Sequence, residues 1–184
     1  MRKVQRSDVI DYKTYNDGRD AYRKRILEEK AKRRIHVGEH LTFLFESTDT
    51  MLYQVQEMMR LEQTVRESEI QHEIDTYNQL LGDEGELGCT LLIEIDNQVE
   101  RDAKLKAWLD LPAHLYLKLE GGQLVRAVWD TAQVDTRLSS VQYLKFAVGS
   151  QPPVAIGSDH PALKVETTLT PAQRETLGLD LRSV

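Results

Sequence analysis

The sequence predicts an α+β fold in which a mostly antiparallel sheet has one face covered by helices. Several stretches alternate apolar and polar residues, as around Leu41, Phe43 and Phe45, which is the period of a strand with one buried face. Other stretches repeat apolar residues at three- and four-residue steps, which indicates amphipathic helices. Strands buried on one face are typical of antiparallel sheets packed against a helical layer.

The first half of the chain is expected to be mainly helical. The expected elements are a turn or short helix after Ser7, helices at about 16–33, from Thr48 or Asp49 to about 65 and from Ser68 onward, and strands at 34–37 and 40–46. Gly82, Gly85 and Gly88 then predict a flexible loop.

The second half returns to strands. The expected elements are strands at 90–96, 115–119, 125–129 and 141–148, a helix from Asn97 to about 109, a hairpin at Gly121-Gly122, an edge strand at 163–169 and a helix capped by Thr170. The Thr170-Pro171-Ala172-Gln173 stretch combines an N-cap, a proline at the first helical position and a capping-box glutamine.

These elements suggest one domain at residues 1–150, with a basic helical N-terminal arm at 1–36. Residues 151–184 form a C-terminal extension, which we expect to pack on the same domain. The arm holds 12 of the 24 Lys and Arg and 6 of the 30 Asp and Glu, a net charge of +6, so the remaining chain carries −12. Such an arm is expected to pack on its own acidic body or to be a solvated helix, with binding of phosphate groups as the alternative.

Composition excludes several classes of protein. The chain has 184 residues, 40% of them hydrophobic and 29% charged, as in a globular domain. Nucleic-acid binding is unlikely because no known module is present, and no apolar stretch is long enough to span a membrane. The N-terminus lacks the apolar region of a signal peptide, so a cytoplasmic location is expected. Cys89 is the only cysteine, which excludes an intrachain disulfide and predicts a buried packing residue.

Polar residues are concentrated in the predicted helix after Thr48. Those of interest are Gln54, Glu57, Arg60 and Glu62, with Tyr77 and Asn78 on the next helix. They form either a charged exterior or a buried polar network between the two helices. A pair of carboxylates five residues apart does not make a general acid–base site, so whether the protein is an enzyme stays open.

The polar face of the predicted sheet gathers a second group of candidates, His40, Glu46 and Glu94. Charged residues on such a face are most often a solvated surface. The alternative is a metal site, because imidazole and carboxylate suit iron, manganese or zinc. Glu69 and His72 match the Glu-x-x-His spacing of di-iron bundles, but a single copy is expected to be an accidental surface match.

Five stretches carry a resemblance to a known family: VGEHLTFLFESTDTMLYQVQEMMRLE, EIDTYNQLL, GELGCTLLIEI, SSVQYLKFAV and TPAQRETL. Together they resemble the bacterial domain-of-unknown-function family numbered 3501 over nearly the whole chain. The resemblance implies that the family motif includes Glu46, Gln54, Gln56, Glu57, Arg60, Glu62, Tyr77, Asn78 and Glu94. It does not include His72 or Cys89.

The resemblance also implies a cellular setting, because genes of this family often lie beside those for a rubrerythrin and an iron–sulfur protein like heterodisulfide reductase. We therefore expect an accessory protein that binds a redox partner, a rubrerythrin or an iron–sulfur protein, in oxidative stress or electron transfer. A metal-binding protein or metalloenzyme that uses His40, Glu46 and Glu94 is the alternative. Binding of an anionic ligand by the basic arm is a third hypothesis, and a homodimer is left open.

Overall fold

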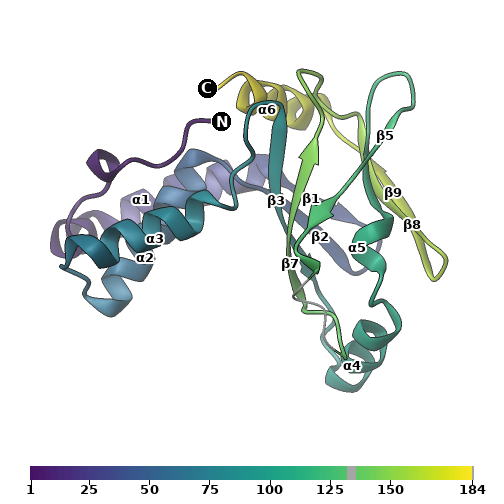
Figure 1. Cartoon of the computed structure of the whole chain (residues 1–184), viewed down its shortest axis with the longest axis horizontal. Coiled ribbons are helices and arrows are strands. Elements are labelled where there is room, and N and C mark those ends of the chain that lie inside the picture. The colour runs from purple at the N-terminus through teal and green to yellow at the C-terminus, as the bar shows by residue number, and fades with distance from the viewer. Residues whose placement is uncertain (132–135, 184) are drawn as a thin grey trace.

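The computed structural model describes residues 1–131 and 136–183, which form a helical lobe beside two packed sheets (Figure 1). Six helices and two antiparallel sheets confirm the predicted α+β class. Within these residues, no helix is both long and apolar enough to cross a membrane.

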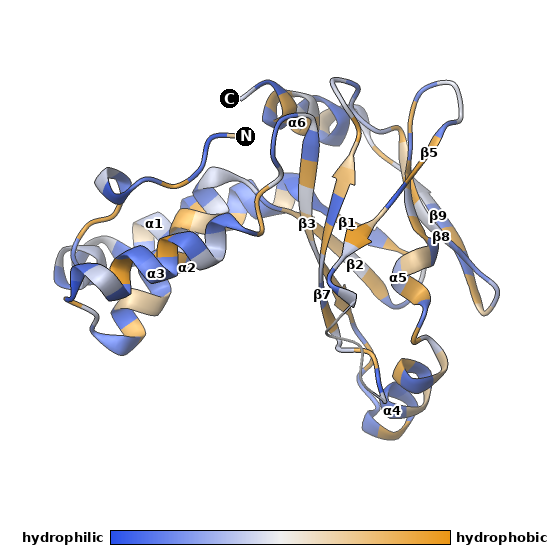
Figure 2. Cartoon of the chain, in the orientation of Figure 1, coloured by the Kyte–Doolittle hydropathy of each residue, from blue (hydrophilic) through white to orange (hydrophobic). Residues whose placement is uncertain are grey.

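The helical lobe is built from the first 81 residues of the chain, which also include the first two strands of a sheet. Its elements are a 3-10 turn at Arg6–Asp8, α1 at Tyr12–Arg33, α2 at Thr48–Glu62 and α3 at Glu67–Asn78. Asp11 caps α1, and Ser47 caps α2 through a capping box with Thr50, one residue before the expected cap. In Figure 2, α2 and α3 are banded with hydrophobic residues. Their buried residues pack with residues of the N-terminal segment and with Leu81 in a small core of the lobe's own. Its members are Met1, Val4, Val9, Met51, Val55, Met59, Ile70, Ile74 and Leu81.

The first sheet has five strands and lies next to this lobe (Figure 1). In spatial order its strands are β1 (Arg34–Val37), β2 (Leu41–Phe45), β3 (Glu86–Ile93), β7 (Val141–Ala147) and β6 (Val128–Trp129). The second sheet has four strands, β5 (Leu124–Arg126), β4 (Leu115–Lys118), β8 (Ala155–His160) and β9 (Leu163–Thr168). The remaining helices are α4 (Gln98–Ala107), α5 (Leu111–His114) and α6 (Pro171–Arg182).

The main core lies between the two sheets. Phe43, Phe45 and Phe146 enter it from the first sheet, and Leu117 and Ile156 enter it from the second; all five are fully buried. This explains the period of two along the strands, because alternate residues face the opposite sheet. Cys89 lies in the same core, as predicted, and burial raises the pKa of its thiol.

The two-sheet arrangement differs from the single sheet that the sequence predicts. The expected strand at 125–129 is interrupted at Ala127, whose N–H donates to the carbonyl of Leu115 at 3.1 Å. The residues before it pair with β4 in the second sheet, and those after it pair with β7 in the first. Alternation marks which face of a strand is buried, but it does not say which strand lies beside it.

Two further elements differ from the expectation. The predicted C-terminal extension contains a strand that was not expected, β8, which lies between β4 and β9. The expected glycine loop ends earlier than predicted, because β3 begins at Glu86 and includes Gly88. A Cβ on Gly88 would lie 2.0 Å from the carbonyl oxygen of Leu80, so glycine serves close backbone packing here and not flexibility.

Other local predictions are confirmed. Gly121 and Gly122 form the β4–β5 hairpin, both with positive φ. The strand β9 is at the edge of its sheet. The capping box of α6 is complete, because Thr170 and Gln173 each bond the other's backbone N–H, at 3.2 and 2.9 Å.

Candidate functional site

Glu57 and Arg60, which the sequence singles out on α2, meet the basic helix α1. The guanidinium of Arg19 donates two hydrogen bonds to the Glu57 carboxylate, at 2.7 and 2.9 Å. The hydroxyl of Tyr15 donates a third at 2.7 Å, and one nitrogen of Arg60 lies 3.5 Å away. These contacts form a partly buried polar network that fastens α1 to α2, whereas the network left open from the sequence was one between α2 and α3.

The charges around Glu57 fix its protonation. The hydrogen bonds from Arg19 lower the pKa of Glu57 to about 2 against the opposing effect of burial, with Tyr15 and Arg60 also lowering it. The same contacts act on the partners, since burial and the carboxylate raise the pKa of Tyr15. A carboxylate held ionised in this way does not accept a proton near neutral pH, so this geometry favours a structural role for Glu57 over acid–base chemistry.

Two side-chain amides hold the N-terminal segment against the lobe. Gln56 on α2 accepts from the N–H of Ile10 at 2.8 Å and donates to its carbonyl at 3.1 Å. Asn78 on α3 makes the same pair of bonds to Val4, at 2.8 and 3.0 Å. Each amide thus satisfies one backbone donor and one acceptor in a segment whose only regular structure is a short 3-10 turn.

Glu46 is buried between the lobe and the first sheet, with its side chain bound by two threonines. Thr50 donates to one carboxylate oxygen and Thr90 to the other, both at 2.6 Å. Lys30 of α1 supplies a positive charge nearby: burial lowers the pKa of its ammonium group, and the attraction of Glu46 opposes that shift. This arrangement satisfies a buried carboxylate internally.

Glu94 lies at the other end of the β2–β3 ladder. Its carboxylate accepts from the hydroxyl of Thr42 at 2.5 Å, and that hydroxyl lies 2.8 Å from Nδ1 of His36. Six residues of extended strand separate the position of Glu94 from that of Glu46, about 20 Å at 3.3 Å per residue. The two carboxylates therefore do not converge on one site.

His40 turns away from both carboxylates. Its Nε2 lies 2.5 Å from Nζ of Lys104, and its ring is 5.9 Å from that of Trp108. An ammonium group only donates, so this nitrogen accepts and its lone pair is occupied. In the part of the chain that the structure describes, His40, Glu46 and Glu94 form no group that could hold a metal, and no other such group is found.

The remaining predicted residues are Gln54, Glu62 and Tyr77. Gln54 is half-buried on α2, and Glu62 is exposed at the end of that helix. Burial raises the pKa of Tyr77 on α3, and the nearby Glu73, Tyr143 and Glu62 raise it further. Tyr77 thus lies where the helical lobe approaches strand β7.

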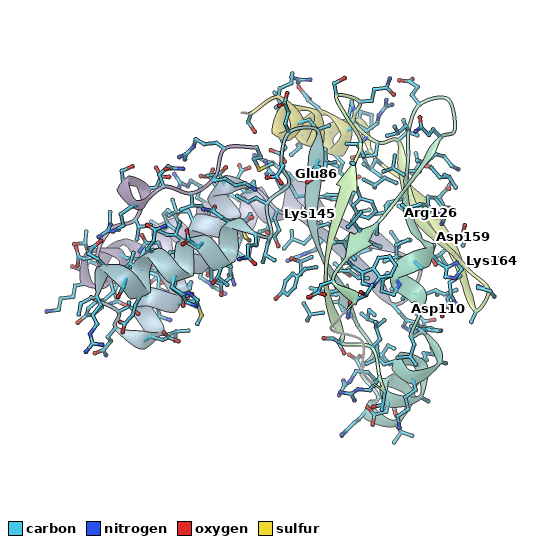
Figure 3. The ribbon with its side chains drawn as sticks, viewed as in Figure 1. Glu86, Asp110, Arg126, Lys145, Asp159 and Lys164 are labelled. Carbon is cyan, nitrogen blue, oxygen red and sulfur yellow. The ribbon has the colours of Figure 1, made fainter. Side chains whose placement is uncertain are left out.

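A cleft opens at this approach. A cavity of about 280 Å³ lies between the residues that follow α3 and the strands β6 and β7. Its lining includes Leu80, Trp129, Tyr143, Leu144 and Lys145. Figure 3 shows Lys145 on the side of the sheet that faces the helical lobe. None of these residues was selected from the sequence, because all but Leu80 occupy ordinary strand positions and Leu80 directly follows a predicted helix.

Apolar side chains are exposed beside this cleft. Val128 is 64% exposed, Tyr143 45% and Val141 37%. Val141, Tyr143 and Lys145 alternate on one face of β7, and Val128 of β6 lies opposite Lys145. We call Val128, Val141 and Tyr143 the cleft patch. The rest of this sheet face, around Leu44, is buried where α1 packs on β2.

The far side of the molecule presents a charged face on the second sheet. Arg126 donates to Asp159 at 2.6 and 3.0 Å, and both lie on the side away from the helical lobe (Figure 3). Tyr116 and Lys118 both donate to Glu166, at 2.8 and 2.7 Å. The division into two sheets places these charged residues on a different sheet from the strands next to Glu46 and Glu94.

The sequence identified Glu57 but missed the residues that bind it. Arg19 is one of several cations in α1, and Tyr15 was not assigned to the predicted helix. Asp11 gives a usable signal, since it caps α1 by accepting from the N–H groups of Lys13 and Thr14. An earlier helix start would have included Tyr15 in the helix.

Comparisons with known proteins agree with one another. The sequence model of the DUF3501 family, described as proteins of unknown function, matches residues 3–181. A crystal structure of a protein of unknown function from Burkholderia pseudomallei is similar over 98% of this chain and 100% of that one, with a TM-score of 0.90 and 28% identity. None of the proteins with curated descriptions matches the sequence significantly.

Proposed function

Because the chain belongs to the DUF3501 family, whose function is unknown, we propose a function from its own surface: it is an accessory protein that docks a redox partner on the cleft patch. The partner is a rubrerythrin or an iron–sulfur protein. This choice rests on the gene neighbourhood that the family resemblance implies, and the docking surface rests on the structure.

The observation that carries the proposal is the exposure of Val128, Val141 and Tyr143 next to a cavity. Neighbouring exposed apolar side chains beside a cavity are typical of interaction sites. By contrast, Gln56, Glu57 and Asn78 are engaged within the protein and have little capacity left for a partner. The family motif then maintains the shape of the lobe that forms one side of the cleft.

The size and charge of the surface suit a transient complex. Electron-transfer partners bury small interfaces and dissociate readily. Lys145 and Lys3 both lie near Asp83 at the edge of the cleft, at 3.9 and 2.9 Å, so both signs of charge flank the patch. Charges at the rim of an interface mainly set the rate of association and its dependence on salt.

The test is binding of the full-length protein to a rubrerythrin and to an iron–sulfur protein of the same organism, measured by biolayer interferometry. We expect saturable binding to one of them, at a Kd of about ten micromolar or below, as for transient complexes. The double variant Val128→Ser/Tyr143→Ser should weaken it about tenfold or more, since it removes the apolar centre of the interface.

The matched control is Val99→Ser on α4, because Val99 is 80% exposed and lies outside the cleft lining. It should bind like the wild type. Absence of binding to both partners at tens of micromolar, or equal binding by the double variant, would overturn the proposal. Circular dichroism of each variant verifies that it is folded.

A further inference from the structure

A second cavity lies where the start of α1 meets the end of α2. It has a volume of about 480 Å³ and is lined by Tyr12, Lys13, Asn16, Asp17, Arg60 and Gln63. This volume is in the range of small-molecule sites. Residues 12–17 begin α1, and residues 60–63 lie at the end of α2. The opposite ends of these helices adjoin the strands β1 and β2, so the cavity is at the end of the lobe away from the sheets.

Arg60 has hydrogen-bonding capacity that the described protein does not use. Its Nε–H is buried and has no hydrogen-bond partner within the described chain, and its one contact with Glu57 is long, at 3.5 Å. Glu57 already accepts three shorter bonds from Arg19 and Tyr15. A buried donor left unpaired is destabilising, so such groups usually have a partner. The fork of an arginine matches two oxygens of a carboxylate or phosphate.

The other lining residues add donors of the same kind. Lys13 is exposed and has no ion pair among the described residues, and Asn16 and Gln63 contribute amides. Two cationic side chains face one carboxylate, that of Asp17, so the lining has a net positive charge. This combination favours an anion over a cation or an apolar molecule.

Gln63 is held in an unfavourable backbone conformation. Its φ is +52°, and among the described residues it is the only one other than glycine with a positive φ. It follows α2 at the position where glycine is preferred, and its N–H donates to the carbonyl of Met59. Glycine would adopt this conformation at lower conformational cost. The presence of glutamine instead suggests that its side-chain amide has a role in the cavity.

We propose that this cavity binds a small organic oxyanion, a phosphate monoester or a carboxylate, through the guanidinium of Arg60 and the ammonium of Lys13. The Nε–H of Arg60 is closed to solvent in this structure, so the guanidinium turns toward the cavity to donate to two oxygens of the anion. Lys13 supplies charge at the open side, and the amides of Asn16 and Gln63 donate to the remaining oxygens. The site does not depend on the cleft patch, which lies beside the sheet, so the two proposals can fail separately.

The test is nuclear magnetic resonance titration of the full-length protein with inorganic phosphate and, separately, with citrate. Glycerol serves as the neutral probe. The Nε–H signal of Arg60 reports directly on the unpartnered donor, and it should move on saturation with at least one of the anions. The backbone amide of Gln63 should move with it. Whichever anion binds more tightly identifies phosphate or carboxylate as the ligand chemistry.

Arg60→Gln should weaken binding of that anion by about tenfold or more, because it removes a charge-assisted, two-point contact. Arg23→Gln is the matched control, since it removes the same charge from an exposed position on α1 outside the cavity. Gln63→Gly should weaken binding while leaving the melting temperature unchanged or higher. The proposal is overturned if neither anion moves the Arg60 signal, if glycerol moves it equally, or if Arg60→Gln and Arg23→Gln bind alike.

Discussion

Arg19 and Glu57, 38 residues apart, form a two-point ion pair that joins the basic N-terminal helix to α2. Part of the positive charge of the N-terminal arm, residues 1–36, is therefore neutralised within the protein, because Arg19 binds a carboxylate of the same chain. The ion pair also gives Glu57 a structural role, as the acceptor on which α1 and α2 meet.

In the variant Glu57→Gln, the free energy of unfolding should change less with pH in the acidic range than it does in the wild type. The pKa of Glu57 is lowered to about 2, so its contribution to stability is fully present above the ordinary value of 4.5 and is lost as pH falls toward 2. The variant should be up to about 3 kcal/mol less stable than the wild type at pH 7, with the difference shrinking below pH 4.5. Urea unfolding at several pH values measures this.

Glu62→Gln is the control for the Glu57 prediction, because Glu62 is on the same helix and is exposed. Its effect should be within about 0.5 kcal/mol at every pH. A difference between Glu57→Gln and the wild type that grew on acidification would contradict the assigned role.

Asp180→Ala should be strongly destabilising. Arg33 at the end of α1 donates to both oxygens of Asp180 on α6, each at 2.8 Å, and both side chains are about 9% exposed. Removing the carboxylate leaves a buried guanidinium with only Glu29 as an acidic partner, which should cost about 3–5 kcal/mol.

Thermal and urea unfolding test the Asp180 prediction, with the exposed Asp20 changed to alanine as the control. A double variant, Arg33→Met/Asp180→Leu, should recover much of the lost stability, since apolar residues of similar size often replace a buried ion pair without loss. If Asp180→Ala were no more harmful than Asp20→Ala, the pair would not fasten α1 to α6.

Gln56→Glu should loosen the N-terminal segment. The amide of Gln56 is 2% exposed and bonds both the N–H and the carbonyl of Ile10, whereas a carboxylate accepts from the first and repels the second. We expect a loss of about 1–3 kcal/mol that diminishes in acid, where a protonated carboxyl can donate again.

Hydrogen exchange of the Ile10 amide and limited proteolysis before α1 measure this loosening. Gln98→Glu, an amide-to-carboxylate change at an exposed position on α4, should leave both unchanged. Equal protection of Ile10 in Gln56→Glu and the wild type would show that the amide does not hold the segment.

Local features of the fold could be predicted from the sequence because their causes are local. The capping box at Thr170 and the hairpin at Gly121-Gly122 depend on residues no more than three positions apart. The family motif was likewise visible in the sequence. Of its residues, only Arg60 is seen to approach Glu57, whereas Gln56 and Asn78 bind the N-terminal segment. The residues that bind Glu57 most closely, Tyr15 and Arg19, could not be selected because they lie 42 and 38 positions away in the sequence.

Features that depend on distant contacts could not be predicted in this way. The predicted strand at 125–129 is divided at Ala127, whose N–H bonds to the carbonyl of Leu115, and the chain passes there from the second sheet to the first. The strand β8 was missed because Gly157, Ser158 and Asp159 lack the apolar alternation of a strand. The cleft patch likewise exists only because α3 and β7 come together, which no local pattern encodes.

Gly88 and Gly18 test how far glycine is required by packing. A Cβ at position 88 would lie 2.0 Å from the Leu80 carbonyl oxygen, a backbone atom that cannot move without displacing the chain after α3. Gly88→Ala should therefore cost more than about 3 kcal/mol or prevent folding.

Gly18 is exposed within α1, with open space at its Cβ position, so Gly18→Ala should be stabilising by about 0.5–1 kcal/mol. Melting temperatures of the two variants provide the measurement, and an unaltered value for Gly88→Ala would contradict the close approach of β3 to Leu80.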